Sequence, residues 1–307
     1  MGFISKIKYH KKLRLYFKTI EDFLSNGYYQ VDDKTIKKVT FSLKDFYKTF
    51  KVKTHKEKLF NYTEGSLFFT AYKVGFLTND KAFYFINKKE RFNLYKENYL
   101  KYKENLPYKS ISLTFYNERQ LVVAPLINGK IYKDLSHFDI FLNALFEAAS
   151  KNKHELVKKR VFDQDVLIPW YVQHGDCKNA NIIWDENDGF TLIDLEAINL
   201  YPALYDVFYY LFITKKEESI SVLKSDVFLK AVCAFFKQKM SNVPDNILDL
   251  ALASYADYTA SKLEPDSELY EFEFYLFWRH YDSFDAFPLT KKVLDDYGKR
   301  LIEYGIK

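Results

Sequence analysis

The residues with the clearest chemical potential lie close together in the second half of the chain. His174, Gly175 and Asp176 are followed by Asn181, five positions after the aspartate, and later by Asp194. Phosphoryl transfer needs a carboxylate that accepts a hydroxyl proton and hard oxygen ligands that hold Mg²⁺ against a triphosphate. An aspartate and an asparagine on one loop, with a second aspartate on the next, can supply both. The spacing therefore predicts phosphoryl transfer.

The residues between Asn181 and Asp194 predict a short hairpin. Two apolar runs, 182–184 and 190–193, flank the polar turn 185–189. A hairpin returns the chain, so that Asp194 enters the site from the side opposite to Asn181. Taken singly, His174 is also typical of a buried core histidine, and Asn181 of a turn residue. The interpretation rests on the whole set.

This set resembles the aminoglycoside phosphotransferase and choline kinase family, which shares the protein-kinase-like fold. The resemblance rests on His174-Gly175-Asp176 with Asn181, on Ile193-Asp194-Leu195-Glu196, and on Asp206, twelve residues after Asp194. It implies that Asp176 is the catalytic base and that Asn181 and Asp194 bind Mg²⁺. It also implies that His174 and Asp206 support the catalytic loop, and that ATP is the phosphoryl donor.

The motif departs from eukaryotic protein kinases in an informative way. Gly175 replaces the arginine that, in those kinases, reads a phosphorylated activation loop. Only eleven residues separate Asp194 from Asp206, too few for a long regulatory loop. Both features predict a constitutive kinase of small molecules.

The resemblance implies a nucleotide-binding N-lobe, but its residues are less clearly marked. The segment 61–66, with Gly65 and Ser66, is the candidate phosphate loop, although one glycine is also typical of an ordinary turn. Lys88 is the candidate strand lysine, with Lys89 and Lys81 as competitors, and another N-lobe lysine can take its place.

Two further N-lobe features follow from the same resemblance. Glu97, between Glu90 and Glu104, is the candidate helix glutamate that pairs with the lysine. Pro125 and Leu126 lie in an apolar run that ends at Gly129, which fits a hinge whose backbone binds adenine. An edge strand followed by a turn has the same pattern.

The coarse pattern predicts an α+β, bilobal protein-kinase-like fold with an N-lobe over 1–127 and a C-lobe over 128–307. The N-lobe is β-rich and the C-lobe mainly helical. Strands are expected over 67–77, 81–87, 110–116 and 121–127, a helix over 88–106, a further helix over 137–150, and helices from Tyr205 onward.

Composition limits the other possibilities. The chain of 307 residues has 46 Lys and Arg against 41 Asp and Glu, a net charge of +5 that is too mild to indicate nucleic-acid binding. Its two cysteines suggest neither a disulfide framework nor a metal site. No apolar run is long enough to span a bilayer, and the N-terminal residues do not resemble a secretory signal, so a cytoplasmic location is expected.

The charge is uneven along the chain. Residues 1–60 carry 15 basic and six acidic side chains, a net charge of +9, which leaves 31 basic and 35 acidic side chains elsewhere, a net charge of −4. A solvated basic face accounts for this pattern. The alternative is peripheral contact of the basic N-terminus with an anionic membrane or glycolipid.

The acceptor is the least determined part of the prediction. Residues 269–287 interleave acidic and aromatic side chains, which suit sugars or amines but are also typical of a core-facing helix. The basic N-terminus favours a small-molecule or glycan acceptor such as a lipopolysaccharide-core or capsule sugar. The alternatives are a choline/ethanolamine or aminoglycoside kinase, a catalytically inactive kinase-like binding protein, and transfer to protein side chains, including nucleotidylation. The short spacing between Asp194 and Asp206 disfavours the last.

Overall fold

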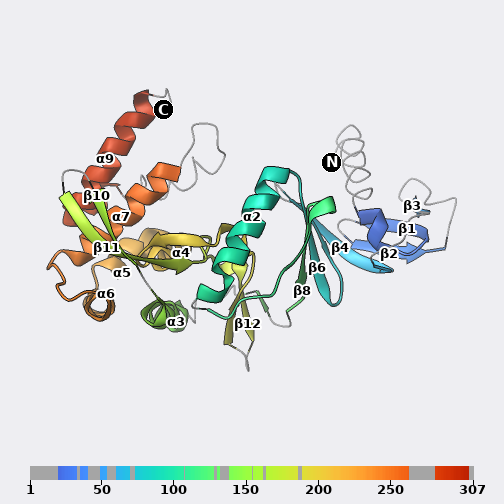
Figure 1. The fold of residues 1–307 in the computed structure, drawn as a ribbon, viewed down its shortest axis with the longest axis horizontal. Helices are drawn as coiled ribbons and strands as arrows, with labels where there is room; N and C mark the ends of the chain where they lie inside the picture. Colours follow the sequence, from blue (N-terminus) through green and yellow to red (C-terminus); the bar gives the residue numbers. More distant parts are fainter. Residues whose placement is uncertain are drawn as a thin grey trace. The chain divides into compact units, whose positions relative to one another are not determined.

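The fold is that of a computed structural model, and it divides into two compact units (Figure 1). The structure describes residues 20–32, 35–40, 49–53, 60–69, 73–106, 108–127, 130–131, 138–153, 155–161, 164–185, 189–262 and 281–303. One unit comprises residues 1–96 and 111–128, and the other comprises residues 97–110 and 129–307. The predicted lobes, 1–127 and 128–307, did not place residues 97–110 in the second unit.

The first unit is built on an eight-stranded antiparallel sheet with the order β3-β1-β2-β4-β5-β6-β8-β7. Its strands are β1 (Gly27–Asp32), β2 (Thr35–Val39), β3 (Thr49–Val52), β4 (Glu64–Phe69), β5 (Lys73–Leu77), β6 (Lys81–Ile86), β7 (Thr114–Tyr116) and β8 (Leu121–Pro125). The aromatic side chains of Phe23, Phe76 and Phe83 are fully buried in its core.

The single strand predicted over 67–77 is in fact two strands. β4 ends at Phe69, and β5 begins at Lys73 and runs back along it, with Phe69 opposite Val74. The apolar and aromatic residues on both sides of the reversal are equally strong strand formers, and no glycine or proline marks it. The hairpin from β5 to β6, by contrast, lies where the polar residues 78–80 predicted it.

The helix α2 (Lys89–Tyr102) follows β6, and a 3₁₀ turn over Lys103–Asn105 follows it, close to the helix predicted over 88–106. Phe92 and Tyr95 are buried, and their rings lie 5.9 and 5.5 Å from that of Phe115 in β7. This spacing of three residues puts both rings on one face of the helix. Aromatic packing therefore fixes the start of α2 on the sheet.

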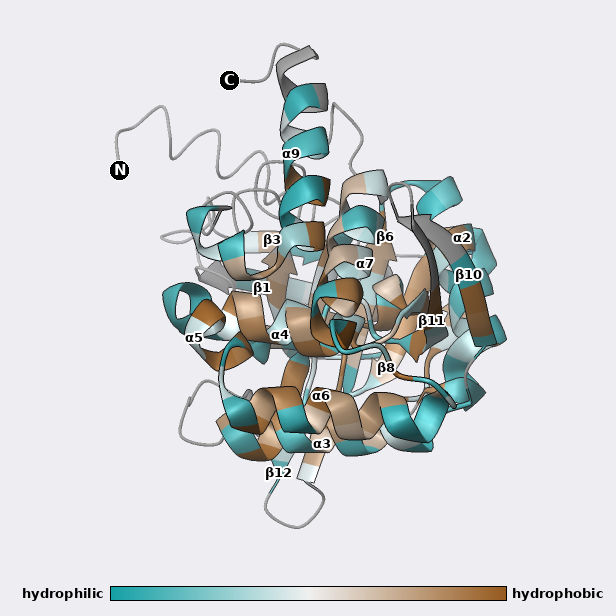
Figure 2. Cartoon of the chain, turned by 90° about the vertical axis from the view of Figure 1, so that its left-hand side faces the viewer, coloured by the Kyte–Doolittle hydropathy of each residue, from teal (hydrophilic) through white to brown (hydrophobic). Residues whose placement is uncertain are grey.

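The second unit is mainly helical. Its helices are α3 (Phe138–Lys151), α4 (Tyr205–Lys215), α5 (Ser219–Leu223), α6 (Asp226–Lys239), α7 (Ile247–Lys262) and α9 (Pro288–Glu303). Every residue from Tyr205 to Phe212 in α4 is buried, so this helix is the centre of the core. Figure 2 shows α4 largely in hydrophobic colours, whereas α9 alternates hydrophilic and hydrophobic residues. A helix apolar on every side is one that other elements surround.

Two small sheets complete this unit and carry the residues singled out in the sequence. One has the order β10-β11-β14, from β10 (Glu155–Val161), β11 (Gln164–Gln173) and β14 (Asn199–Pro202). The other has the order β13-β12-β9, from β9 (Lys130–Ile131), β12 (Ile182–Asp185) and β13 (Gly189–Leu192). The predicted hairpin is confirmed as the β12–β13 pair, in which Ile182 lies opposite Leu192.

The α+β class is confirmed, since an antiparallel sheet dominates one unit and helices dominate the other. Within the described ranges, no helix has both the length and the hydropathy that crossing a membrane requires. Most of the basic residues in 1–60, and residues 269–280 of the predicted acceptor segment 269–287, lie outside the described residues. Predictions that concern them stay predictions.

Candidate active site

A buried carboxylate holds the start of the loop that follows β11. Asp206, fully buried in the first turn of α4, accepts hydrogen bonds from the backbone N–H groups of His174 at 2.8 Å and Gly175 at 2.9 Å. Tyr108 donates its hydroxyl to the same carboxylate at 3.1 Å. Burial raises the pKa of Asp206, while the surrounding donors favour its charged form. Three donors on one carboxylate tie the loop to the helix core.

Gln173, the last residue of β11, adds a second tie between the same elements. Its side-chain oxygen accepts the backbone N–H of Asp206 at 3.0 Å, and its amide nitrogen donates to the carbonyl of Pro202 at 2.8 Å. Gln173 is fully buried, so both bonds are shielded from water. The loop is thus anchored through side-chain and backbone groups at once.

Gly175 is required by this geometry. Its φ of +82° lies in the left-handed region, and a β-carbon there would overlap the hydroxyl of Tyr201. Tyr201 is held in place because its hydroxyl donates to the carbonyl of Ala197 at 2.5 Å. Any other residue at 175 would need both a strained backbone and a displaced tyrosine.

Asp176, the predicted catalytic base, is held by three donors. Its Oδ1 accepts the hydroxyl of Tyr209 at 2.7 Å. Its Oδ2 accepts the ammonium group of Lys178 at 2.7 Å and the side-chain amide of Asn181 at 2.8 Å. The side chain is 21% exposed, so it is fixed yet reachable from solvent.

His174 connects the loop to the β12–β13 hairpin. Its Nδ1 accepts the backbone N–H of Asp176 at 3.2 Å, which leaves Nε2 to donate to the carbonyl of Ile193 at 2.7 Å. The backbone N–H of Ile193 donates in turn to the carbonyl of Asn181 at 2.9 Å. The fully buried His174 therefore positions the base and the residue before Asp194 together.

The two predicted metal ligands lie at the open end of the hairpin. Asn181 directly precedes β12, and Asp194 follows Ile193, to which Asn181 is bonded. The side-chain nitrogen of Asn181 donates to both the carbonyl and the carboxylate of Asp176, so Oδ1 is the side-chain atom left to bind a cation. Asp194 has a φ of +63°, a strained conformation that clusters at functional sites.

This donor set fits Mg²⁺. The ion is usually held by one or two protein oxygens together with substrate phosphates and water. Among the described residues, there is no group of three or more His, Cys, Asp or Glu that could form an all-protein metal cage. One amide oxygen and one carboxylate match a site that is completed by a nucleotide.

The predicted phosphate loop is wrong in its local structure. Gly65 and Ser66 lie inside β4, where Gly65 pairs with Ile36 and Ser66 pairs with Thr35 and Leu77. A β-carbon on Gly65 would overlap the ring of Phe76, so the glycine serves close packing between strands. The link between β4 and β5, residues 70–72, lies outside the described residues.

Lys88 and Glu97 do not form the predicted pair. β6 ends at Ile86, and Lys88 is an exposed residue just before α2 whose carbonyl accepts the N–H of Phe92. Glu97 is exposed on α2, nine positions further on, which is roughly 13 Å along a helix. Lys88 is therefore not a strand lysine. Its separation from Glu97 along the helix excludes a direct ion pair between the two residues.

Pro125 and Leu126 lie at the end of β8, as the predicted hinge requires. Both are exposed, and Pro125 lies opposite Lys81 at the last register position of β8. The backbone N–H of Leu126 donates to the carbonyl of Asp80 at 2.8 Å, so this group is already bonded. The carbonyl of Leu126 is the remaining backbone candidate for a nucleotide contact.

Three residues near these sites were missed in the sequence. Lys178 lies two positions after Asp176, and Tyr209 lies one helical turn after Asp206. Both could have been predicted as neighbours of the motif residues from these spacings. Lys73, at the start of β5, is the only buried lysine among the described residues. Its ammonium lies 5.4 Å from the ring centre of Tyr84. No sequence signal separates it from its many lysine neighbours.

One family model matches the part of the chain that contains this site. Residues 133–227 match the Phosphotransferase enzyme family, and this stretch contains Asp176, Asn181, Asp194 and Asp206. The match confirms the resemblance drawn from the sequence. A search of curated proteins finds no match.

Solved structures with related folds include three kinases. Choline kinase LicA from Streptococcus pneumoniae is 13% identical, with 71% of this chain and 91% of that chain covered and a TM-score of 0.45. Macrolide 2'-phosphotransferase MphH from Brachybacterium faecium is 10% identical, with coverage of 73% and 91% and a TM-score of 0.41. A choline/ethanolamine kinase family protein from Mesorhizobium loti is 10% identical, with coverage of 75% and 92% and a TM-score of 0.40.

The bonds to Asp206 predict a stability effect. Asp206→Asn replaces a charged acceptor by an amide whose NH₂ group opposes the N–H donors of the loop, so we expect a loss of roughly 2–4 kcal/mol in the free energy of unfolding. Urea denaturation would measure it, and amide hydrogen exchange should rise at residues 174 and 175. The exposed Asp226 is the control, and Asp226→Asn should cost about 0.5 kcal/mol or less. Equal effects of the two variants would contradict the bracing role.

Proposed function

We propose that this chain, whose residues 133–227 match the Phosphotransferase enzyme family, transfers the γ-phosphoryl group of ATP to a hydroxyl of a small molecule or sugar. The observation that carries the proposal is the environment of Asp176. A carboxylate has about four acceptor positions, and Tyr209, Lys178 and Asn181 occupy three of them. One position is left to receive a substrate hydroxyl.

Asp176 acts as the base in this scheme. The acceptor hydroxyl donates to Asp176, its oxygen attacks the γ-phosphorus, and its proton passes to the carboxylate while the bond between the γ-phosphorus and the β,γ-bridging oxygen breaks and ADP leaves. The ammonium group of Lys178, 2.7 Å from Asp176, places positive charge beside the reacting atoms. Tyr209 keeps the carboxylate in one orientation through its 2.7 Å bond to Oδ1.

Asn181 and Asp194 are the residues that would hold Mg²⁺. Bound there, the ion would neutralise charge on the phosphates of the nucleotide. The chain contributes the fixed geometry, because Asn181 is tied to Asp176 and Ile193 is tied to both Asn181 and His174. These bonds set the two ligands before the nucleotide arrives.

For the acceptor, we favour a sugar or glycan hydroxyl, and the basic residues of 1–60 suit an anionic or membrane-linked one. Choline, ethanolamine and aminoglycosides are the alternatives. A screen of candidate alcohols with an ATP-consumption readout would separate these classes. Sustained turnover with choline and none with sugars would redirect the assignment.

A catalytically inactive kinase-like binding protein is the second candidate function. Two observations favour it. Gly65 and Ser66 of the predicted phosphate loop lie within β4, and Lys88 lies between β6 and α2 rather than in a strand. The complete set of Asp176, Asn181 and Asp194 opposes it. A melting temperature that does not change with ATP and Mg²⁺ would favour it over the enzyme.

The role of Asp176 predicts a kinetic effect. Asp176→Asn keeps the shape but removes the proton acceptor, so turnover should fall by roughly 10²–10⁴-fold while nucleotide affinity changes little. Steady-state phosphotransfer and a nucleotide titration would measure the two quantities. Asp185→Asn, at the end of β12, is the control and should keep turnover within about twofold. Unchanged turnover in Asp176→Asn would contradict the assignment.

The role of Asp194 predicts a metal effect. Asp194→Ala removes the only carboxylate of the proposed ion site, so the rise in melting temperature with ATP and Mg²⁺ should be lost. The rise with ATP and EDTA should be the same in both proteins, which serves as the internal control. An undiminished Mg²⁺-dependent shift would count against Asp194 as a ligand.

The buried lysine of β5 is our replacement for Lys88. Lys73 lies next to the β4–β5 connection, and burial strengthens any contact of its ammonium group with a phosphate. Lys73→Met should weaken nucleotide binding by at least about tenfold, whereas Lys88→Met should change it by less than about twofold. Equilibrium titration with a fluorescent ATP analogue would compare them, with circular dichroism to check the fold. If Lys88→Met weakened nucleotide binding more than Lys73→Met, Lys88 would again be the candidate lysine.

A further inference from the structure

The donors around Asp176 are divided unequally between its two carboxylate oxygens. Lys178 and Asn181 both donate to Oδ2, whereas the hydroxyl of Tyr209 donates to Oδ1. Each carboxylate oxygen has about two acceptor positions, so the position left for a substrate hydroxyl is on Oδ1. Tyr209 therefore holds the same atom that takes the proton in the proposed reaction, and a shift of its hydroxyl would act directly on the reacting group.

The ring of Tyr209 belongs to a stack of three tyrosines. Tyr205 lies one turn before Tyr209 on α4, and the two rings are 6.1 Å apart and inclined by 14°. Tyr205 also stacks on Tyr201 of β14, at 4.4 Å and 27°. All three side chains are buried, and stacking at these distances is a favoured arrangement of aromatic rings. We call Tyr201, Tyr205 and Tyr209 the tyrosine column.

The two outer members of the tyrosine column meet successive residues of the catalytic loop. The hydroxyl of Tyr201 occupies the space of a β-carbon at Gly175, and the hydroxyl of Tyr209 is bonded to Asp176. A tyrosine hydroxyl lies at the far end of a rigid ring, so a small tilt of the ring displaces it. A displacement of about 1 Å in a site can reduce a rate by on the order of 10²-fold. The ring of Tyr205, which stacks on both, is thus placed to control the glycine and the base together.

Tyr205 is itself held by a helix that carries none of the proposed site residues. Tyr255 and Tyr258, three positions apart on α7, lie edge-to-face with its ring at 5.0 and 5.6 Å. Tyr258 also lies edge-to-face with Tyr201 at 5.2 Å. Helix α7 therefore fixes two members of the tyrosine column, and Tyr205 connects this support to Tyr209.

We propose that Tyr205 is a positioning residue for the base, whose ring keeps the hydroxyl of Tyr209 on Oδ1 of Asp176. It acts through Tyr209 and contacts no reacting atom. The inference rests on the proposed role of Asp176. A failure of that role would appear in Asp176→Asn, whereas a failure of this inference would appear in the variants of Tyr205 while Asp176→Asn still loses turnover.

The first experiment measures ATP hydrolysis with Mg²⁺, in which water takes the place of the unidentified acceptor. Tyr205→Leu should lower kcat by about tenfold or more and leave the KM for ATP within about twofold, because the base is displaced and the nucleotide is not. Tyr205→Phe keeps the ring and should stay within about threefold of the wild type. Tyr205→Met, which fills more of the space without a ring, has the same expectation as Tyr205→Leu and replaces it if that variant does not fold.

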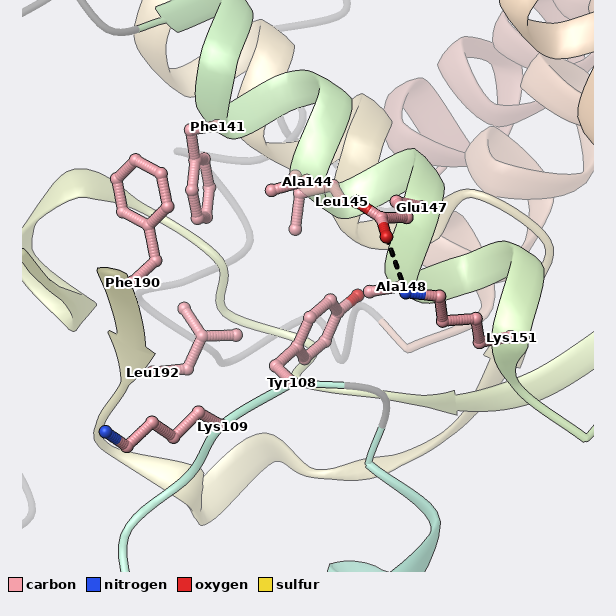
Figure 3. Close-up of a pocket in the computed structure, with 10 residues that line it drawn as sticks. All are labelled: Tyr108, Lys109, Phe141, Ala144, Leu145, Glu147, Ala148, Lys151, Phe190 and Leu192. Atoms are coloured by element: carbon pink, nitrogen blue, oxygen red, sulfur yellow. Dashed lines mark hydrogen bonds and ion pairs between the residues drawn. The ribbon is translucent and has the colours of Figure 1, made fainter. Parts of the chain in front are cut away.

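Tyr210→Leu is the matched control, because Tyr210 is a fully buried tyrosine of the same helix that packs elsewhere. Its ring stacks on Phe138 of α3 at 5.5 Å and lies 4.7 Å from that of Phe141, which lines the pocket between α3 and β13 shown in Figure 3. Its removal opens a cavity in the core but leaves the tyrosine column intact, so the melting temperature should fall while kcat stays within about threefold.

A double-mutant cycle tests the route through Tyr209. Tyr209→Phe removes the bond to Oδ1 and should lower kcat by about tenfold. Because Tyr205 acts through that bond, adding Tyr205→Leu to Tyr209→Phe should change kcat by no more than about twofold further. Multiplication of the two separate losses would overturn the proposal.

Amide hydrogen exchange without nucleotide gives a readout that does not depend on turnover. Tyr205→Leu should speed up exchange at Gly175 and Asp176 by about threefold or more, and Tyr210→Leu should not. If the wild type does not hydrolyse ATP, exchange alone decides. Unchanged exchange at both residues, equal kcat in Tyr205→Leu and Tyr210→Leu, or a loss in Tyr205→Phe as large as in Tyr205→Leu would each overturn the proposal.

Discussion

A carboxylate buried in an apolar core needs donors around it. Here two of the three donors are backbone N–H groups of the loop after β11, and the third is the hydroxyl of Tyr108. Asp206 lies on the helix that the rest of its unit packs around, so the core itself fixes its position. Two successive N–H groups then have to point at one carboxylate, which creates a concave turn of the chain. The shape of the loop is thus a consequence of core packing, and the orientation of Asp176 follows from it.

The β12–β13 hairpin extends this bonded arrangement to the proposed metal ligands. His174 bonds forward to Asp176 and across to Ile193, and Ile193 bonds to Asn181. The proposed base and the proposed metal ligands are therefore connected by backbone and imidazole hydrogen bonds, beside the side-chain bonds from Asn181 to Asp176. Such preorganisation spares the cost of arranging these groups when the substrate binds. It also explains why a short segment of sequence can contain so much of the site.

Because much of the site lies in one short segment of sequence, part of it could be predicted. Asp176, Asn181, Asp194 and the hairpin between them depend on spacing within some twenty residues, which a sequence displays directly. The contacts of Tyr209 and Lys73 depend on which face of a helix or strand is buried, which spacing alone does not settle. The reversal between β4 and β5 was not predicted because strong strand formers flank it. Gly65, which suggested a loop, is a packing glycine. Site residues that lie close together in the sequence could be predicted. Which of several similar residues the fold brings to the site could not.

The lack of space for a β-carbon at Gly175 limits which residues this position can accept. Eukaryotic kinases place an arginine at this position, as noted above, and use it to sense phosphorylation. Here the hydroxyl of Tyr201 occupies the space of any β-carbon, and the backbone has a left-handed φ. A single substitution to arginine would meet both obstacles at once, and a smaller residue at 201 would leave the backbone strain in place. An arginine at this position would therefore require a change of the backbone as well as a change at 201.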